Sequence, residues 1–206
     1  MDEKQKKILI ESAKLFQKYG IRSISMDDIS REMGISKKTM YQYFENKADL
    51  ISKILNYNFE LHSQVEDAHI LEKGNAIDIL LTVSKKVCEE LKEFNPSITF
   101  DLQKFYPEIY KQFFEKKRDH IFEKIKCNIK KGIEQDIFRN DLDIELVARL
   151  YVQRLADFHN PDFILSGEGS FEKVFKAMFD NHIRGISNAK GIEYYEKQKN
   201  NLNFNL

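Results

Sequence analysis

Apolar side chains recur every three or four positions along most of the chain, a spacing that places them on one face of an α-helix. Alternation of apolar and polar positions, which would indicate strands, is scarce. Only three prolines and eight glycines interrupt the 206 residues, so helices with few breaks are expected. The pattern predicts an all-α fold.

Residues that cap or end helices predict short helices and tight turns at the start of the chain. Gly20 is a good C-terminal breaker for the first helix, and Ser25 and Ser36 are good N-caps for the second and third. Asp27 and Asp28 follow the first of these caps, where the helix dipole favours anions. The predicted helices cover residues 3–19, 25–33 and 37–44, and a fourth begins near residue 46.

The predicted helices lengthen after Gly74. Gly132 is expected to end one of them, and Asp143 is expected to cap the next. The Asn/Lys-rich residues 197–206 are expected to fray. The predicted helices cover residues 76–94, 97–106, 107–131, 143–159 and 171–186, of which the last is the final substantial helix.

Charge is balanced over the whole chain but unevenly distributed. The chain has 33 basic and 33 acidic residues; residues 1–58 hold 11 basic against 8 acidic, and the remainder holds 22 against 25. This asymmetry fits a DNA-facing head on an acidic body, although three charges could arise by chance. Two cysteines, no signal-peptide core and no apolar run of about 18 residues predict a soluble protein of the reducing cytoplasm, away from membranes.

The segment from Ser25 to Leu50 carries the functional pattern. Two short helices meet at Gly34, whose missing Cβ permits the tight turn of a helix-turn-helix. The outer face of the second of them has donors, a cation pair and aromatic tips that suit a major groove and its phosphates. Alone, the Lys-Lys pair is typical of a solvated face, and Tyr41 and Tyr43 could be half-buried packing residues; the joint pattern is more specific. The residues expected to pack inward are Ile29, Met33, Ile35, Met40 and Phe44.

The sequence from Gly34 to Lys47, GISKKTMYQYFENK, resembles the recognition helix of TetR (tetracycline-repressor-like) transcriptional regulators, and the resemblance covers about residues 5–55. It implies a homodimer on a roughly palindromic double-stranded operator, with DNA recognition in residues 1–46 and a ligand-binding and dimerisation body in 47–206. Lys38 departs from the small residue that many members carry there, which affects operator preference. The candidate DNA-binding residues are Ser25, Ser36, Lys37, Lys38, Thr39, Tyr41, Gln42, Tyr43 and Lys47.

The resemblance also gives the body two expected functions. Apolar stripes in residues 144–158 and 174–186 are ordinarily core, but members of the family pair through their last two long helices. The candidate dimer residues are Tyr151, Leu155, Phe158, Phe175, Met178, Phe179 and His182. Aromatic residues are frequent in residues 94–122. They could simply fill the core, or they could form the wall of an inducer pocket whose cationic end would bind an amphipathic acid. The candidate ligand residues are Phe100, Tyr106, Tyr110, Phe113, Phe114 and Lys117.

Catalytic and metal-binding patterns are missing from the sequence. The five histidines form no pair at helical i,i+3 or i,i+4 spacing, and neither a glycine-rich phosphate loop nor a nucleophile elbow is present. We therefore expect no enzyme, cofactor or metal. Three alternatives stay open at this stage: an interaction protein of the same fold that does not bind DNA, an enzyme, which would require a convergent catalytic cluster that the sequence does not show, and an activator in place of a repressor.

Overall fold

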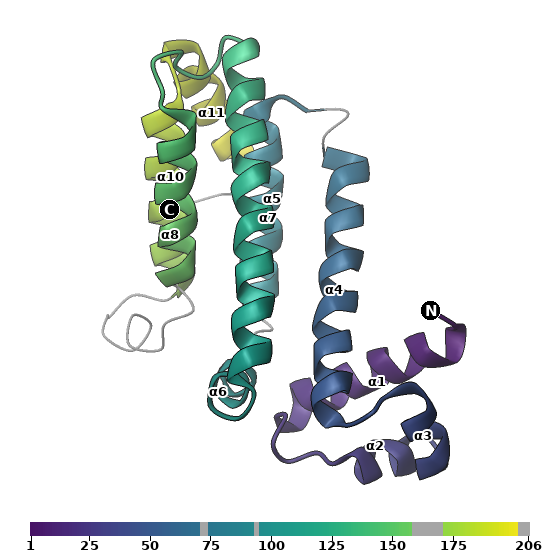
Figure 1. Ribbon diagram of the computed structural model, residues 1–206. Helices are drawn as coiled ribbons and strands as arrows, with labels where there is room; N and C mark the ends of the chain where they lie inside the picture. The colour runs from purple at the N-terminus through teal and green to yellow at the C-terminus, as the bar shows by residue number, and fades with distance from the viewer. Residues whose placement is uncertain (71–73, 93–94, 158–170, 202–206) are drawn as a thin grey trace. The chain divides into compact units, whose positions relative to one another are not determined.

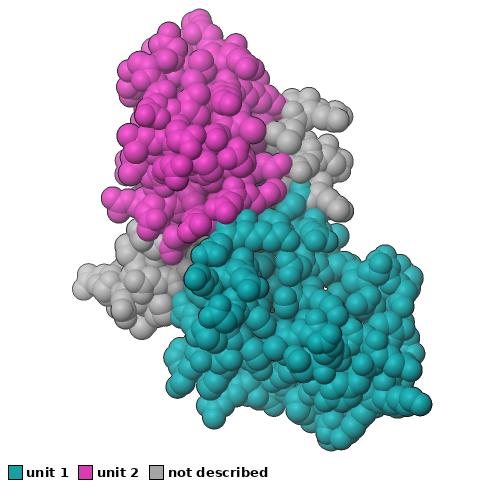
Figure 2. Space-filling model, in the orientation of Figure 1, with its two compact units in different colours: residues 1–65, 94–117 teal, residues 66–93, 118–206 magenta. Residues whose placement is uncertain are grey.

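The structure is a computed structural model that describes residues 1–70, 74–92, 95–157 and 171–201 (Figure 1). Every named element among these residues is a helix, and their β-contact is an isolated bridge between Phe138 and Ser187. The all-α prediction is confirmed. The chain forms two compact units, residues 1–65 with 94–117 (unit 1) and residues 66–93 with 118–206 (unit 2), shown in Figure 2.

Unit 1 is built around three short N-terminal helices. They are α1 (Glu3–Tyr19), α2 (Met26–Glu32) and α3 (Lys37–Tyr43), followed by the first part of α4 (Lys47–Ile70). These helices agree with the predicted ones to within a residue or two. Unit 1 also contains α6 (Pro96–Phe105) and the start of α7 (Pro107–Glu134).

The core of unit 1 joins residues that are distant in the sequence. Ile8, Ile29, Met40 and Leu50 are fully buried in one cluster, and Leu102 of α6 completes it. The burial of each apolar side chain contributes on the order of 1.5–3 kcal/mol. The N-terminal helices therefore do not form a core by themselves, because α6 supplies part of it.

Unit 2 contains the remaining helices. Around the second part of α7 lie α5 (Ala76–Lys92), α8 (Ile144–Asp157), α10 (Phe171–Ile186) and α11 (Ala189–Asn201). In Figure 1 α8 and α10 lie side by side, which agrees with the 4.1 Å between the ring centroids of Tyr151 and His182. The buried core includes Ile77, Leu81, Ile129, Phe138, Ala148, Phe179, Ile183 and Tyr195.

The prediction that Gly132 ends its helix was wrong. Helix α7 continues through it to Glu134. A Cβ added to Gly132 would lie 2.0 Å from the ring of Phe138, so this glycine makes room for an aromatic side chain within the core. Packing against Phe138, and not helix termination, therefore accounts for a glycine at position 132.

The prediction that the last substantial helix ends at residue 186 was also wrong. Helix α11 follows it and includes residues 197–201 of the segment expected to fray. Its Tyr195 is fully buried and donates a 2.9 Å hydrogen bond to Asp180. The polar sequence of α11 concealed a helix that tertiary contacts hold.

Candidate nucleic-acid interface

Helix α2 begins with a complete capping box. The backbone N–H of Asp28 donates to the Ser25 hydroxyl, and the Asp28 carboxylate in turn accepts from the N–H and hydroxyl of Ser25. These bonds, which favour the ionised carboxylate, hold the pKa of Asp28 below its usual value. The start of α2 is thus fixed by its own sequence.

The turn between α2 and α3 depends on the backbone freedom of Gly34. Its φ is +63°, in the left-handed region that favours glycine. A Cβ there would meet nothing within 4 Å, so the requirement is conformational and not steric. The glycine acts as predicted, and it lets the chain reverse sharply into α3.

Helix α3 has one buried side and one exposed side. Met40 is fully buried in the core of unit 1 and anchors the helix. On the opposite side, Tyr41 has 52% of its surface exposed, and Lys38 and Gln42 are also exposed. The structure brings these three side chains together on one short helix, as a recognition helix requires.

Lys37 lies at the start of this exposed surface and is already paired. Its ammonium lies 2.5 Å from Asp27 Oδ2 on α2, and both side chains are largely exposed. Any anion that binds Lys37 must therefore compete with this carboxylate. The pairing was not evident from the sequence, because the two residues are ten positions apart.

Three other predicted DNA-binding residues serve the local fold as well. Ser36 caps α3 by accepting from the Thr39 N–H, and the two hydroxyls lie 2.9 Å apart. Tyr43 is half-buried against the core, and burial together with the nearby Asp2 carboxylate raises its pKa. All three remain at least partly exposed, at the edge of the recognition surface.

Lys47 begins α4 and is held more firmly than a free surface lysine. Its ammonium donates to the backbone carbonyl of Ile21 over 2.5 Å and lies 5.7 Å from the centre of the Phe16 ring. Burial lowers its pKa, while the charges of Asp101 and Asp28 act in the opposite direction. The lysine predicted to bind a phosphate therefore also ties α4 to the turn after α1.

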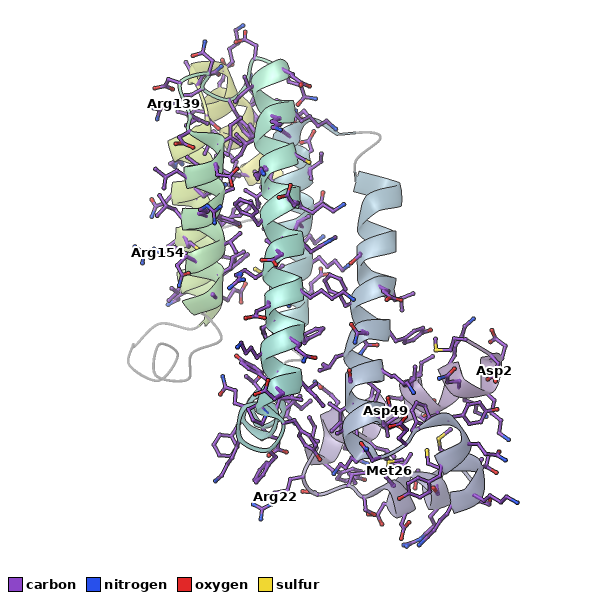
Figure 3. All side chains as sticks on the ribbon, viewed as in Figure 1. Asp2, Arg22, Met26, Asp49, Arg139 and Arg154 are labelled. Atoms are coloured by element: carbon purple, nitrogen blue, oxygen red, sulfur yellow. The ribbon has the colours of Figure 1, made fainter. Side chains whose placement is uncertain are left out.

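Asp101 of α6 was missed by the sequence reasoning. Its Oδ2 accepts the backbone N–H of Arg22 over 2.8 Å, and its side chain is buried. An isolated aspartate in a helical segment carries no signal of this role, because its partner is 79 residues away. Figure 3 labels Arg22 in the turn that leads to Met26, the first residue of α2.

The six predicted ligand residues all lie in unit 1 and only partly come together. The rings of Tyr110 and Phe114 pack at a tilt of 39° with 4.2 Å between their centroids, and Phe113 contacts Phe59 of α4 edge to face. Tyr106 packs against the core, Lys117 is half-buried, and Phe100 is 53% exposed on α6. The aromatic cluster is therefore Phe59, Tyr110, Phe113 and Phe114, without Phe100.

The predicted dimer residues lie mostly inside unit 2. Tyr151, Phe175 and Phe179 are buried within the chain itself, while Leu155 and Met178 are partly buried against its core. His182 stacks on Tyr151, and burial lowers its pKa to about 4. Phe158 lies outside the described residues. The large apolar side chains that the described parts of these two helices expose are those of Leu146, Leu150 and Val174.

The described part of the chain offers neither a metal site nor a membrane span. No group of three or more His, Cys, Asp or Glu side chains there is arranged to hold a metal ion. No helix there combines the length and the apolar character that a bilayer crossing needs.

Comparison with known proteins places the N-terminal segment in a family. The sequence profile of "Bacterial regulatory proteins, tetR family" matches residues 8–54, which span α1 to the first part of α4. The chain is 29% identical over 128 residues to the HTH-type transcriptional regulator SAB2452 of Staphylococcus aureus, covering 56% of this chain and 69% of that protein. It is 22% identical over 185 residues to YvaF of Bacillus subtilis, an HTH-type regulator, covering 88% and 95% of the two chains.

Solved structures share the fold along most of the chain. A transcriptional regulator of Cytophaga hutchinsonii superposes with a TM-score of 0.76 at 17% identity, covering 91% of this chain and 100% of that one. A TetR-family regulator of the same organism superposes with a TM-score of 0.67 at 21% identity, covering 90% of this chain and 96% of that one. A regulator of Saccharomonospora viridis, solved in complex with choline, superposes with a TM-score of 0.71 at 18% identity, covering 91% of this chain and 100% of that one. These likenesses show the shared fold, while the family profile and the sequence relatives identify the chain as a DNA-binding transcriptional regulator of the TetR family.

Proposed function

We propose that this protein is a ligand-responsive repressor that acts in the cytoplasm and binds a nearly palindromic operator as a homodimer. The observation that carries the proposal is the two-sided character of α3. Met40 holds the helix in the core while Tyr41, with 52% of its surface exposed, points outward. Residues 1–46 would carry DNA recognition, and residues 47–206 would carry dimerisation and the response to a ligand.

The candidate DNA-binding residues fall into two groups according to the chemistry of their side chains. Lys38, Tyr41 and Gln42 suit base edges, because they offer donors and an amide that can pair with adenine. Ser25, Ser36, Thr39 and Tyr43 suit phosphates, because their hydroxyls lie at the ends of the short helices. Lys37 and Lys47 would contact phosphates by exchanging their present partners, Asp27 and the Ile21 carbonyl.

The operator can be found by sequencing the DNA crosslinked to the protein in cells. Tyr41→Ala should then weaken operator binding by about 1–3 kcal/mol and leave helix content unchanged. Tyr19→Ala is a matched control, because Tyr19 has 49% of its surface exposed in the same unit but lies at the end of α1. If both variants bind the operator like the wild type, α3 is not the recognition helix.

We propose that the dimer forms through α8 and α10, by their exposed sides and not by the residues first predicted. Leu146 and Leu150 are more than half exposed, one helical turn apart on α8, and Val174 is exposed on α10. Apolar side chains at this spacing form the seam of a helix bundle. Two recognition helices about 34 Å apart would then fit successive major grooves.

The proposed ligand is an amphipathic acid bound near the aromatic cluster and Lys117. Lys116, next to it, lies 5.1 Å from the centre of the Phe59 ring, so positive charge borders this cluster. The Saccharomonospora viridis regulator was solved with choline, a cation, and its fold is similar. A cationic ligand would be repelled by the two lysines, which favours an acid here. In the alternative, the lysines only lay their stems on apolar surface with their charges in water.

A module of the same fold that binds a protein in place of DNA is the second candidate. The basic and aromatic exposed side of α3 argues against it. Such a module would show no salt-dependent affinity for DNA, whereas a regulator that contacts phosphates binds its operator and loses affinity steeply as salt rises.

A further inference from the structure

A carboxylate of α6 closes the turn between α1 and α2. Asp101 has 8% of its surface exposed, and its Oδ2 accepts the Arg22 N–H over 2.8 Å. The same oxygen lies 3.4 Å from the position that a Cβ on Gly20 would occupy. Asp101 is therefore fitted closely against residues 20–22.

Backbone groups in this turn need such partners. Gly20 ends α1 with a φ of +81°, so the chain leaves the helical ladder there and the next N–H groups lose their helical acceptors. Asp101 satisfies one of them, on Arg22. A backbone N–H that is shielded from water and lacks an acceptor destabilises the fold.

Lys47 binds a second backbone group of the same turn, the carbonyl of Ile21. Its ammonium donates to the Ile21 carbonyl over 2.5 Å, from the first residue of α4. The side chain of Ile21 is itself buried in the core of unit 1. Residues 21 and 22 are thus held by an acceptor from α6, a donor from α4 and an apolar anchor between them.

The turn leads directly from α1 into α2. Ser25, the N-cap of α2, follows Arg22 by three residues, and α3 follows α2 through the tight turn at Gly34. A displacement at residues 20–22 therefore moves the start of α2 and, with it, the helix that faces DNA. Small misplacements of groups that read base edges cost affinity for the specific sequence more than for phosphates in general.

We infer that Asp101 is a positioning residue for operator binding: by accepting the Arg22 N–H it fixes, from α6, the turn that places α2 and α3. Asp101 does not touch DNA in this role, since it is buried. The inference rests on the proposed recognition by α3. Helix α6 is remote in sequence but belongs to the same compact unit as the N-terminal helices.

Two conservative variants separate geometry from charge. Asp101→Asn keeps an oxygen acceptor at the same distance along the side chain but removes the charge near Lys47. Asp101→Glu keeps the charge but moves the carboxylate by one methylene, into a site already 3.4 Å from the Gly20 Cβ position. If Asp101 acts as the acceptor for Arg22, Asn should preserve function and Glu should not.

The experiment compares full-length wild type, Asp101→Asn, Asp101→Glu and Asp101→Ala. Each is titrated with the operator duplex and with an unrelated duplex over a range of salt concentrations. We expect Glu and Ala to lose about tenfold in operator affinity, and Asn to stay within about threefold of the wild type. Affinity for the unrelated duplex and the salt slope should stay unchanged in all of them. Hydrogen exchange at the Arg22 amide should be faster in the Glu and Ala variants only.

Three results would overturn the inference. These are wild-type operator affinity in Asp101→Glu, an Asn variant as weak as the Glu variant, or equal losses on both duplexes. The Asn and Glu pair decides the matter even if Asp101→Ala does not fold. Tyr41→Ala serves as the reference for the proposed function. If Tyr41→Ala binds the operator like the wild type, the proposed recognition by α3 is wrong; if Tyr41→Ala is weak but Asp101→Glu binds like the wild type, only the role of Asp101 is wrong.

Discussion

The Lys37 ammonium and Asp27 Oδ2 lie 2.5 Å apart and join the first turn of α3 to the first turn of α2. Both side chains are largely exposed, so the pair contributes less than about 1 kcal/mol to stability. If α3 recognises DNA as proposed, the pair has a greater effect on DNA affinity, because it neutralises the Lys37 cation at the edge of the exposed side of α3.

Asp27→Asn should therefore strengthen binding to DNA of any sequence. It frees Lys37 and removes a negative charge close to the phosphates, so the salt slope should rise by up to about one unit. Asp141→Asn is the control, since Asp141 forms an equally exposed pair with Arg139 in unit 2. Weaker binding by Asp27→Asn would mean that Lys37 must be held by Asp27 to reach the DNA.

The dimer proposal predicts that Leu150→Glu dissociates the protein. Leu150 is 60% exposed in the single chain, so a charge there leaves the core intact but opposes burial against a second copy. Sedimentation should show monomers, and operator affinity should fall because the second half-site is lost. Leu61→Glu, at a leucine with 48% exposure on α4, should remain dimeric. An undisturbed dimer for Leu150→Glu would exclude this side of α8 from the interface.

Stability should fall on acidification because of His182. Burial lowers the pKa of its imidazole to about 4, and its Nε2 is buried without a hydrogen-bond partner among the described residues. A depressed folded-state pKa means that the stabilisation is fully present above the unfolded value near 6.5 and is lost as the pH falls towards 4. The difference amounts to about 3 kcal/mol.

His182→Phe isolates this contribution, because it keeps a ring against Tyr151 and removes the titration. Between pH 6.5 and 4, the free energy of unfolding should decline less steeply for the variant than for the wild type at equal protein concentration. The carboxylates titrate in both proteins and cancel in the comparison. Parallel curves would show that His182 does not titrate with a depressed pKa.

The ligand proposal predicts that affinity for acids depends on Lys117. By calorimetry, wild-type protein should bind amphipathic acids better than their amides, and Lys117→Met should lose about tenfold for the acids alone, through loss of a charge-assisted contact. Lys116→Met should lose less, since Lys116 is exposed and its ammonium donates to Asn56. Preference for neutral or cationic aromatics, or indifference to Lys117→Met, would contradict the proposal.

Gly132→Ala should destabilise unit 2 although alanine favours helices. The new Cβ would lie 2.0 Å from the Phe138 ring, so the core must shift, at a cost of about 1–3 kcal/mol. Gly185→Ala is the matched control in α10, where a Cβ meets nothing within 4 Å and should stabilise by up to about 1 kcal/mol. Equal denaturation curves for the two variants would remove the packing explanation for Gly132.

Local sequence determined the helix-turn-helix. Ser25, Gly34, Ser36 and the burial of Met40 depend on residues at most a few positions away, through caps, a positive φ and helical periodicity. These interactions are complete within a few turns of chain, so their pattern can be read without the fold. The exposed side of α3 follows from the same periodicity.

Tertiary structure decided what depends on distant partners. Whether Gly132 ends a helix or admits Phe138, whether α11 forms, and whether Phe175 faces a partner or the core all depend on side chains that the local pattern does not place. Asp101 is the clearest case, since its partner is the Arg22 N–H 79 residues away. A hydrogen bond between remote segments leaves no periodic trace in the sequence, because only the packed fold sets its geometry.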